Sequence, residues 1–215
     1  METAGLFSLL EADDSDGLIA ALGGSDASAV RNANGESLYL FAVFRGRQAC
    51  AAALMRRGGL SLHEAALAGD AARVEALLKE APWAIDLLSP DGWTALHLAA
   101  FFGQDAVVVA LLARGASARV MGRAFEHNLP IHAACAGGRI GKAAFGMLIA
   151  ATGDPDAVQK QDYTALMIAA ANGGTDAAEI LLAAGADRAR RQGDGKTAAD
   201  FARERGHAEL AARLA

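Results

Sequence analysis

Long apolar runs are missing from this 215-residue chain, although 53% of its residues are hydrophobic. A membrane-spanning helix needs about 18 or more consecutive apolar residues, and the most apolar segments, such as 106–112, meet Arg or Gly within two or three turns. The first residues, METAGLFSLLEADD, lack the positive charge of a secretion signal and soon become acidic. These absences predict no membrane-spanning helix and no signal peptide, so we expect a cytoplasmic protein.

An excess of basic residues is missing as well. Lys and Arg number 20 against 25 Asp and Glu, which gives a net charge of −5. Nucleic-acid binding needs a basic face, so we do not expect a nucleic-acid partner. Aromatic residues are only 6% of the chain, so the apolar content is largely Ala, Leu and Val, which is typical of closely packed helices with small side chains.

The segment 91–116, DGWTALHLAAFFGQDAVVVALLARGA, contains the pattern that recurs elsewhere in the chain. A small-residue helix follows Thr94, Gly103 ends it, and a second helix carries Val107 and Leu111. Neither helix could bury its apolar face alone, so the unit must stack against neighbours.

Positions equivalent to Thr94 recur from end to end. They are Ala4, Ser37, Leu60, Thr94, Leu129, Thr164 and Thr197, at spacings of 33, 23, 34, 35, 35 and 33 residues. A glycine follows nine positions later in most units: Gly46, Gly69, Gly103, Gly138, Gly173 and Gly206. The pattern predicts about seven units in one domain, the first of them degenerate.

The segment Thr94–Ala99 is close to the T-P-L-H-x-A motif of ankyrin repeats, and the chain therefore resembles the ankyrin-repeat family, most strongly from the third unit onward. The resemblance implies an all-α solenoid, an ankyrin-repeat stack with short β-hairpin or turn connections and a concave binding groove. We expect one ankyrin-repeat domain over residues 1–215, with an N-terminal capping repeat (1–33), a short repeat (34–59), regular repeats (60–192) and a C-terminal capping repeat (193–215).

The spacing of 23 residues is the clear irregularity in this pattern. It predicts that Gly58 and Gly59 form a tight turn between two helices where the other units have a connecting hairpin. The cysteines, Cys50 and Cys135, fall in units three apart. A disulfide needs Cα atoms within about 7 Å, so we expect none.

Three histidines, His63, His97 and His132, share one position per unit, so stacking would place them in a row and not around one ion. We interpret them as structural residues that hydrogen-bond between adjacent units, and we expect no metal, no cofactor and no catalytic residue. The alternative is a metal-dependent or other enzymatic activity at His127, His132 and Cys135, the only metal-like cluster. The run from Gly193 to Thr197 lacks the upstream glycine of a phosphate-binding loop.

Aromatic residues supply the strongest candidates for partner binding. Trp93 and Tyr163 precede their anchor positions, where we expect exposed tips, and Phe44, Phe101 and Phe102 precede the glycines of their units. The full candidate set adds basic residues and comprises Phe44, Arg45, Trp93, Phe101, Phe102, Tyr163, Arg190 and Arg191. In the competing interpretation Phe44 and Phe101 pack between repeats.

These residues predict a monomeric, non-enzymatic interaction module or scaffold that binds an unknown protein through its groove. A structural adaptor that makes contacts through its ends is the further alternative.

Overall fold

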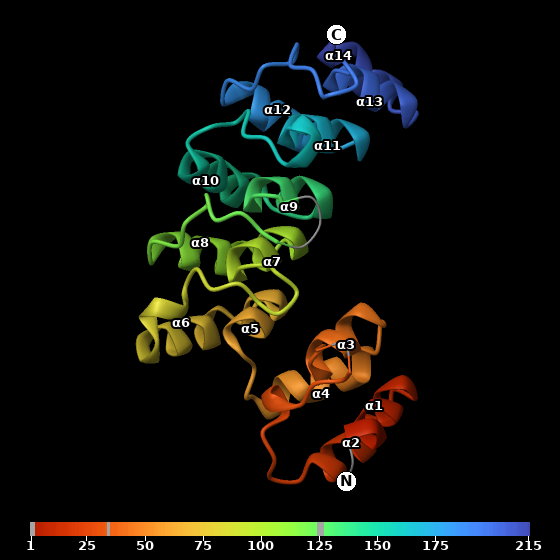
Figure 1. Cartoon of the computed structure of the whole chain (residues 1–215), viewed down its shortest axis with the longest axis vertical. Coiled ribbons are helices and arrows are strands. Elements are labelled where there is room, and N and C mark those ends of the chain that lie inside the picture. Colours follow the sequence, from red (N-terminus) through yellow and green to blue (C-terminus); the bar gives the residue numbers. More distant parts are fainter. Residues whose placement is uncertain (1–2, 34, 124–126) are drawn as a thin grey trace.

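The structure is a computed structural model that describes residues 3–33, 35–123 and 127–215 (Figure 1). Within these residues fourteen α-helices follow one another in seven consecutive pairs. The first four pairs are α1 (Thr3–Glu11) and α2 (Ser15–Leu22), α3 (Leu38–Phe44) and α4 (Gln48–Arg57), α5 (Leu62–Ala68) and α6 (Ala71–Glu80), and α7 (Ala95–Phe102) and α8 (Asp105–Ala113). The last three are α9 (Pro130–Gly137) and α10 (Lys142–Thr152), α11 (Ala165–Ala171) and α12 (Thr175–Ala183), and α13 (Ala198–Glu204) and α14 (Ala208–Leu214). Short 3-10 helices are η1 (Ala27–Ala29), η2 (Pro82–Ala84) and η3 (Lys160–Asp162).

The helix pairs stack along one axis, which confirms the all-α solenoid (Figure 1). From α5 onward the first helices of successive pairs pack on one another, as do the second helices α6, α8, α10 and α12. Small residues permit this close packing, since Ala95, Ala99 and Ala100 of α7 are fully buried. At Gly137 of α9 the approach is so close that an added Cβ would lie 1.8 Å from the carbonyl oxygen of Phe101.

The recurring sequence positions begin and end the first helices. Thr94 is the N-cap of α7, and its side chain accepts a hydrogen bond from the His97 amide; Ser37, Thr164 and Thr197 do the same for α3, α11 and α13. Each of the six predicted glycines has a positive φ at or just after the end of a first helix. This left-handed conformation costs Gly little, which explains its recurrence there.

The connections between pairs are closed turns and not strands. In the described parts of the chain the only β-pairing consists of the isolated bridges Arg31–Ser37 and Val158–Thr164. Several turns are closed by one backbone hydrogen bond from residue i to the carbonyl of residue i+4, as from Ser89 to Trp93 and from Gln192 to Lys196. The expected hairpins are therefore reduced to turns, because no flanking segment is long enough to extend the pairing.

The predicted turn between the second and third pairs is confirmed. Gly58 and Gly59 have φ of 79° and 81° and lead from the end of α4 to Ser61, the N-cap of α5. Because the longer connection is missing here, α3 does not stack on α5 as α5 does on α7. Figure 1 shows α1 to α4 displaced sideways from the column formed by the later helices.

The cysteines Cys50 and Cys135 are buried and free, as expected. Burial is the main cause that raises the pKa of the Cys50 thiol to about 11, and burial also raises the pKa of Cys135. None of the described helices has the length and apolar character needed to cross a lipid bilayer.

Candidate functional site

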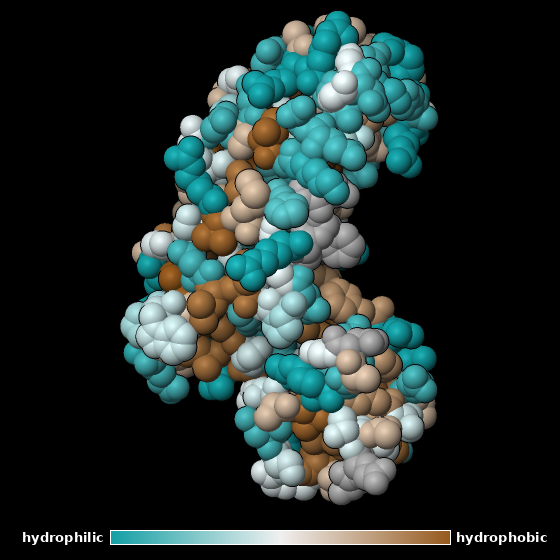
Figure 2. Space-filling view, viewed as in Figure 1, coloured by the Kyte–Doolittle hydropathy of each residue, from teal (hydrophilic) through white to brown (hydrophobic). Residues whose placement is uncertain are grey.

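A groove of about 640 Å³ lies between the N-terminal helices and the middle of the stack. We call it the aromatic groove. The described residues that line it are Phe44, Asp91, Trp93, Leu98, Phe101, Phe102, Asn128, His132, Ala136, Gln159 and Ile168. Figure 2 shows the outline of the molecule hollowed on the right-hand side, between the N-terminal helices and the C-terminal part of the stack.

The lining comes from four of the seven helix pairs, the second, fourth, fifth and sixth, and from the connections that precede the last three of these. Phe44 ends α3, while Phe101 and Phe102 end α7. Ala136 of α9 and Ile168 of α11, the first helices stacked after α7, also line the groove. Phe44 and Phe102 belong to the second and fourth pairs, so the sideways displacement of the N-terminal helices lets one unit contact another across the third.

Four aromatic side chains form a continuous row along the groove. The ring centroids of Phe44 and Phe102 are 6.3 Å apart, those of Phe102 and Phe101 are 5.2 Å apart, and those of Phe101 and Trp93 are 5.4 Å apart. The last two pairs meet edge to face, which is a favourable arrangement for aromatic rings. Phe44 is 55% exposed, whereas the other three are half-buried.

The exposure expected for two aromatic residues was wrong. Trp93 is half-buried, with its ring against those of His97 and Phe101, and Tyr163 is half-buried against Phe201, with centroids 5.2 Å apart. Both precede an N-cap residue, and an apolar side chain at that position commonly packs against the first turns of the helix that follows. The interpretation that Phe44 packs between repeats was also wrong, because most of its surface faces solvent.

The structure brings half of the candidate residues together. Phe44, Trp93, Phe101 and Phe102 line the groove. Four candidates are not among its described lining residues: Arg45, Tyr163, Arg190 and Arg191.

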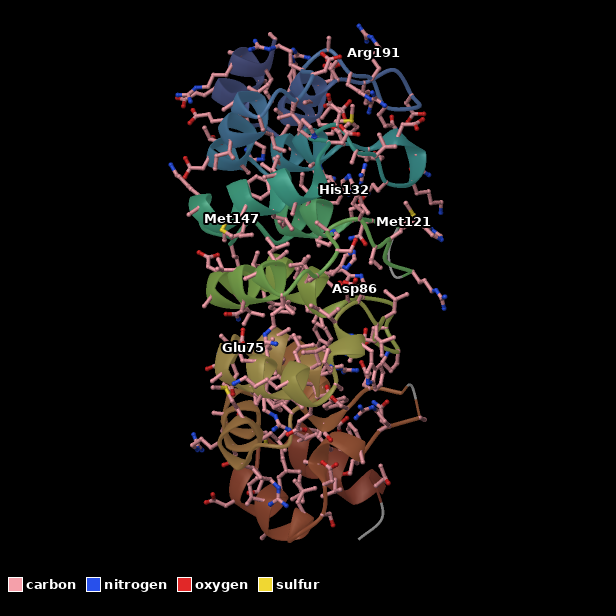
Figure 3. The ribbon with its side chains drawn as sticks, turned by 90° about the vertical axis from the view of Figure 1, so that its left-hand side faces the viewer. Glu75, Asp86, Met121, His132, Met147 and Arg191 are labelled. Carbon is pink, nitrogen blue, oxygen red and sulfur yellow. The ribbon has the colours of Figure 1, made fainter. Side chains whose placement is uncertain are left out.

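The basic candidates lie next to a helix end or in a connection: Arg45 is the C-cap of α3, and Arg190 and Arg191 follow α12. The guanidinium carbon of Arg45 lies 5.0 Å from the Phe41 ring centroid. Arg190 and Arg191 are exposed in the connection after α12, where Arg191 donates a hydrogen bond to the carbonyl of Gly195. Figure 3 shows Arg191 near the C-terminal end of the stack and His132 midway along it.

Polar groups are few in the aromatic groove. Asp91 is exposed at a turn two residues before Trp93. Asn128 is 6% exposed, and its side-chain oxygen receives no hydrogen bond from the described part of the chain. His132 uses both ring nitrogens: Nδ1 accepts from the Leu129 amide at 3.1 Å, and Nε2 is 2.9 Å from the carbonyl oxygen of Ala157.

The row of histidines is structural, as predicted. The Nε2 atoms of His63 and His97 lie 2.8 and 3.0 Å from the carbonyl oxygens of Leu87 and Asn128, each in the connection to the next unit. Nδ1 of His97 and of His132 also accepts a hydrogen bond from the backbone amide of the N-cap residue of the same helix. In α5 Glu64, and not His63, makes this contact with the N-cap. The α5 N-cap is Ser61 and not Leu60, which moves His63 one position along the helix relative to His97.

The alternative of a metal site is not favoured. In the described residues no group of three or more His, Cys, Asp or Glu side chains is arranged to hold a metal ion. His127 is exposed, the nitrogens of His132 are engaged with the backbone, and Cys135 is buried in the apolar core. These contacts give the two buried residues a packing role.

Several residues of interest carry no signal that sequence reasoning detected. Asp91, Asn128 and Ile168 enter the aromatic groove only through the way the units stack. Trp83, which is 74% exposed in η2, is the most exposed of the large apolar side chains that the structure describes, and it lies outside the groove lining. Its position after Pro82, in a connection between units, was the only available indication that its ring would face solvent.

Comparison with known families agrees with this architecture. The family model for ankyrin repeats, which describes three copies, matches residues 11–121, 62–145 and 131–215. The chain therefore belongs to the ankyrin-repeat family, whose members generally serve in protein–protein interaction. No curated protein matches the chain.

Proposed function

We propose that the protein is a non-enzymatic interaction module or scaffold that binds a protein partner through the aromatic groove. The observation that carries this proposal is the row of four rings from Phe44 to Trp93, which lines an open groove. Contiguous exposed apolar side chains commonly mark a site of interaction with another molecule. Aromatic residues also supply much of the binding energy of many protein interfaces.

The dimensions of the site are consistent with a polypeptide ligand. A standard interface buries about 800 Å² on each partner, and the lining of the aromatic groove extends from the second helix pair to the sixth, with the third pair contributing no lining helix. A short extended or helical segment could therefore insert its apolar side chains while its flanks contact the turns. In this proposal residues 1–215 act as one domain with capping repeats at 1–33 and 193–215, and the protein is a cytoplasmic monomer.

Binding should depend on the exposed ring at the edge of the groove. We expect Phe44→Ala to weaken binding at least tenfold, because truncation of an interface anchor commonly costs about 2 kcal/mol. Phe102→Ala should act in the same direction. The measurement is calorimetric titration with the partner, after affinity purification from the native cell has identified it.

Met147→Ala provides the matched control. Met147 is 43% exposed on α10 and does not line the groove, so its removal tests the loss of exposed apolar surface elsewhere. Circular dichroism should show that all three variants are folded. If folded Phe44→Ala and Phe102→Ala both bind the partner as tightly as the wild type does, the proposed site is wrong.

A further inference from the structure

Asp91 is the charged residue among the described residues that line the aromatic groove, since His132 is neutral near pH 7. Its carboxylate forms no hydrogen bond or ion pair with the described residues. The residue lies in the turn that Ser89 and Trp93 close, and it lines the same groove as Trp93, the residue at one end of the aromatic row.

Aromatic rings attract cations to their faces because the face of the ring carries negative charge. The described part of the chain contains examples of this contact: the guanidinium carbon of Arg45 lies 5.0 Å from the Phe41 ring centroid, and Nζ of Lys196 lies 5.8 Å from that of Phe201. In the aromatic groove, by contrast, the described lining contains rings and a carboxylate but no cation.

A purely apolar ligand fits this lining poorly. A ligand that covered Asp91 with hydrocarbon would remove water from a carboxylate and give it no partner, which is costly. A guanidinium group is planar, more weakly hydrated than an ammonium group, and able both to stack on a ring and to donate two parallel hydrogen bonds to a carboxylate. The net charge of −5 also favours the approach of a basic partner.

We infer that the aromatic groove recognises an arginine side chain of the partner protein, stacked on the aromatic row and paired with Asp91. Apolar neighbours of that arginine cover the rings of Phe44 and Phe102. This inference rests on the proposed function and adds the chemistry of the residue that the groove selects. It assigns Asp91 a role in specificity.

A peptide selection tests the preference directly. A phage-displayed library of random dodecapeptides is selected on the immobilised wild-type protein, and the enriched sequences are compared with those from Asp91→Asn and Phe102→Ala. We expect arginine next to apolar residues in the wild-type selection. Asp91→Asn should lose the arginine enrichment, and Phe102→Ala should lose the enriched family altogether.

The chain offers a close control for Asp91. Asp194 is exposed at the tip of the equivalent turn in the last unit, two residues before Lys196, and that turn is closed by the same hydrogen bonds. It does not line the groove. Asp194→Asn makes the same chemical change at the same place in the turn and should leave the selection as in the wild type.

Binding constants then measure the pairing. The strongest arginine peptide is synthesised together with a version in which citrulline, which is uncharged and similar in shape, replaces arginine. We expect Asp91→Asn to weaken binding of the arginine peptide about fivefold, as for a partly exposed ion pair. The citrulline peptide should bind the wild type and Asp91→Asn with similar affinity, and added salt should weaken only the arginine peptide on the wild type.

The outcomes separate this inference from the proposed function. If enriched peptides require Phe102 but show no arginine preference, or if Asp91→Asn leaves the affinity of the arginine peptide unchanged, the arginine inference is overturned and the groove remains a binding site. If no enriched peptide is weakened by Phe44→Ala or Phe102→Ala, both the inference and the proposed function are overturned.

Discussion

Replacement of two buried histidines should change how the stability of the protein depends on pH. His97 and His132 are fully buried, and burial is the main cause that lowers the pKa of each to about 4 from an ordinary value of 6.5. The ring of His132 also contributes to lowering the pKa of His97. The perturbation is His97→Gln with His132→Gln, since Gln can still accept a hydrogen bond from the N-cap amide.

The sign and size of the effect follow from proton linkage. Between pH 6.5 and pH 4 the unfolded chain binds more protons at these positions than the folded protein, so stability is fully present above pH 6.5 and falls as the pH drops. A shift from 6.5 to about 4 corresponds to about 3 kcal/mol for each histidine over the whole range, and to about 2 kcal/mol each at pH 5.

Urea unfolding followed by circular dichroism at pH 8, 6.5 and 5 measures this dependence. At pH 8 the double variant should be about 1–2 kcal/mol less stable for each lost hydrogen bond between units. From pH 8 to pH 5 the wild type should lose about 4 kcal/mol more than the double variant does. Asp and Glu side chains titrate mainly below pH 5, so they contribute little to this difference. Burial also lowers the pKa of His63, and because both proteins contain His63, it adds the same smaller pH dependence of stability to each.

His127→Gln is the control, because His127 is exposed and its replacement should leave the pH dependence in place. The argument from buried neutral rings fails if the wild type keeps its full stability at pH 5. It fails equally if the double variant loses as much stability as the wild type.

Four other perturbations have definite expected outcomes. Gly137→Ala should destabilise the protein by about 2 kcal/mol or more in urea unfolding, because the new methyl group would collide with the α7 backbone; Gly146→Ala, with no heavy atom near its added Cβ, should stabilise it by about 0.5–1 kcal/mol. Asp13→Ala should lower the thermal midpoint, because it removes the carboxylate that accepts a hydrogen bond from the Cys50 amide at the start of α4. The buried thiols of Cys50 and Cys135 should react with a chromogenic thiol reagent only after urea is added, and rapid reaction of the folded protein would contradict the packing described.

Local chemistry in the sequence determined most of the fold. The N-caps at Ser37, Thr94 and Thr197 and the positive-φ glycines are set by the backbone preferences of single residues. The short spacing of 23 residues from Ser37 to Leu60 predicted a tight turn at Gly58 and Gly59 for the same reason, because two glycines can turn the chain where a longer connection is absent. The start of α5 was predicted one residue too early, at Leu60. The alignment of His63 with His97 favoured Leu60, whereas Ser61 is the N-cap and forms a capping box with Glu64.

The aromatic groove, in contrast, was decided only by tertiary structure. Its aromatic residues were recognised individually, but the sequence does not show that Phe44 meets Phe102 across an intervening unit or that Trp93 folds onto its own helix. Nor does it place Asp91 and Ile168 in the same cavity. Sequence periodicity reports which face of a helix is apolar. The offset between successive pairs depends on how all their side chains pack together, and here that offset places the four rings in one row.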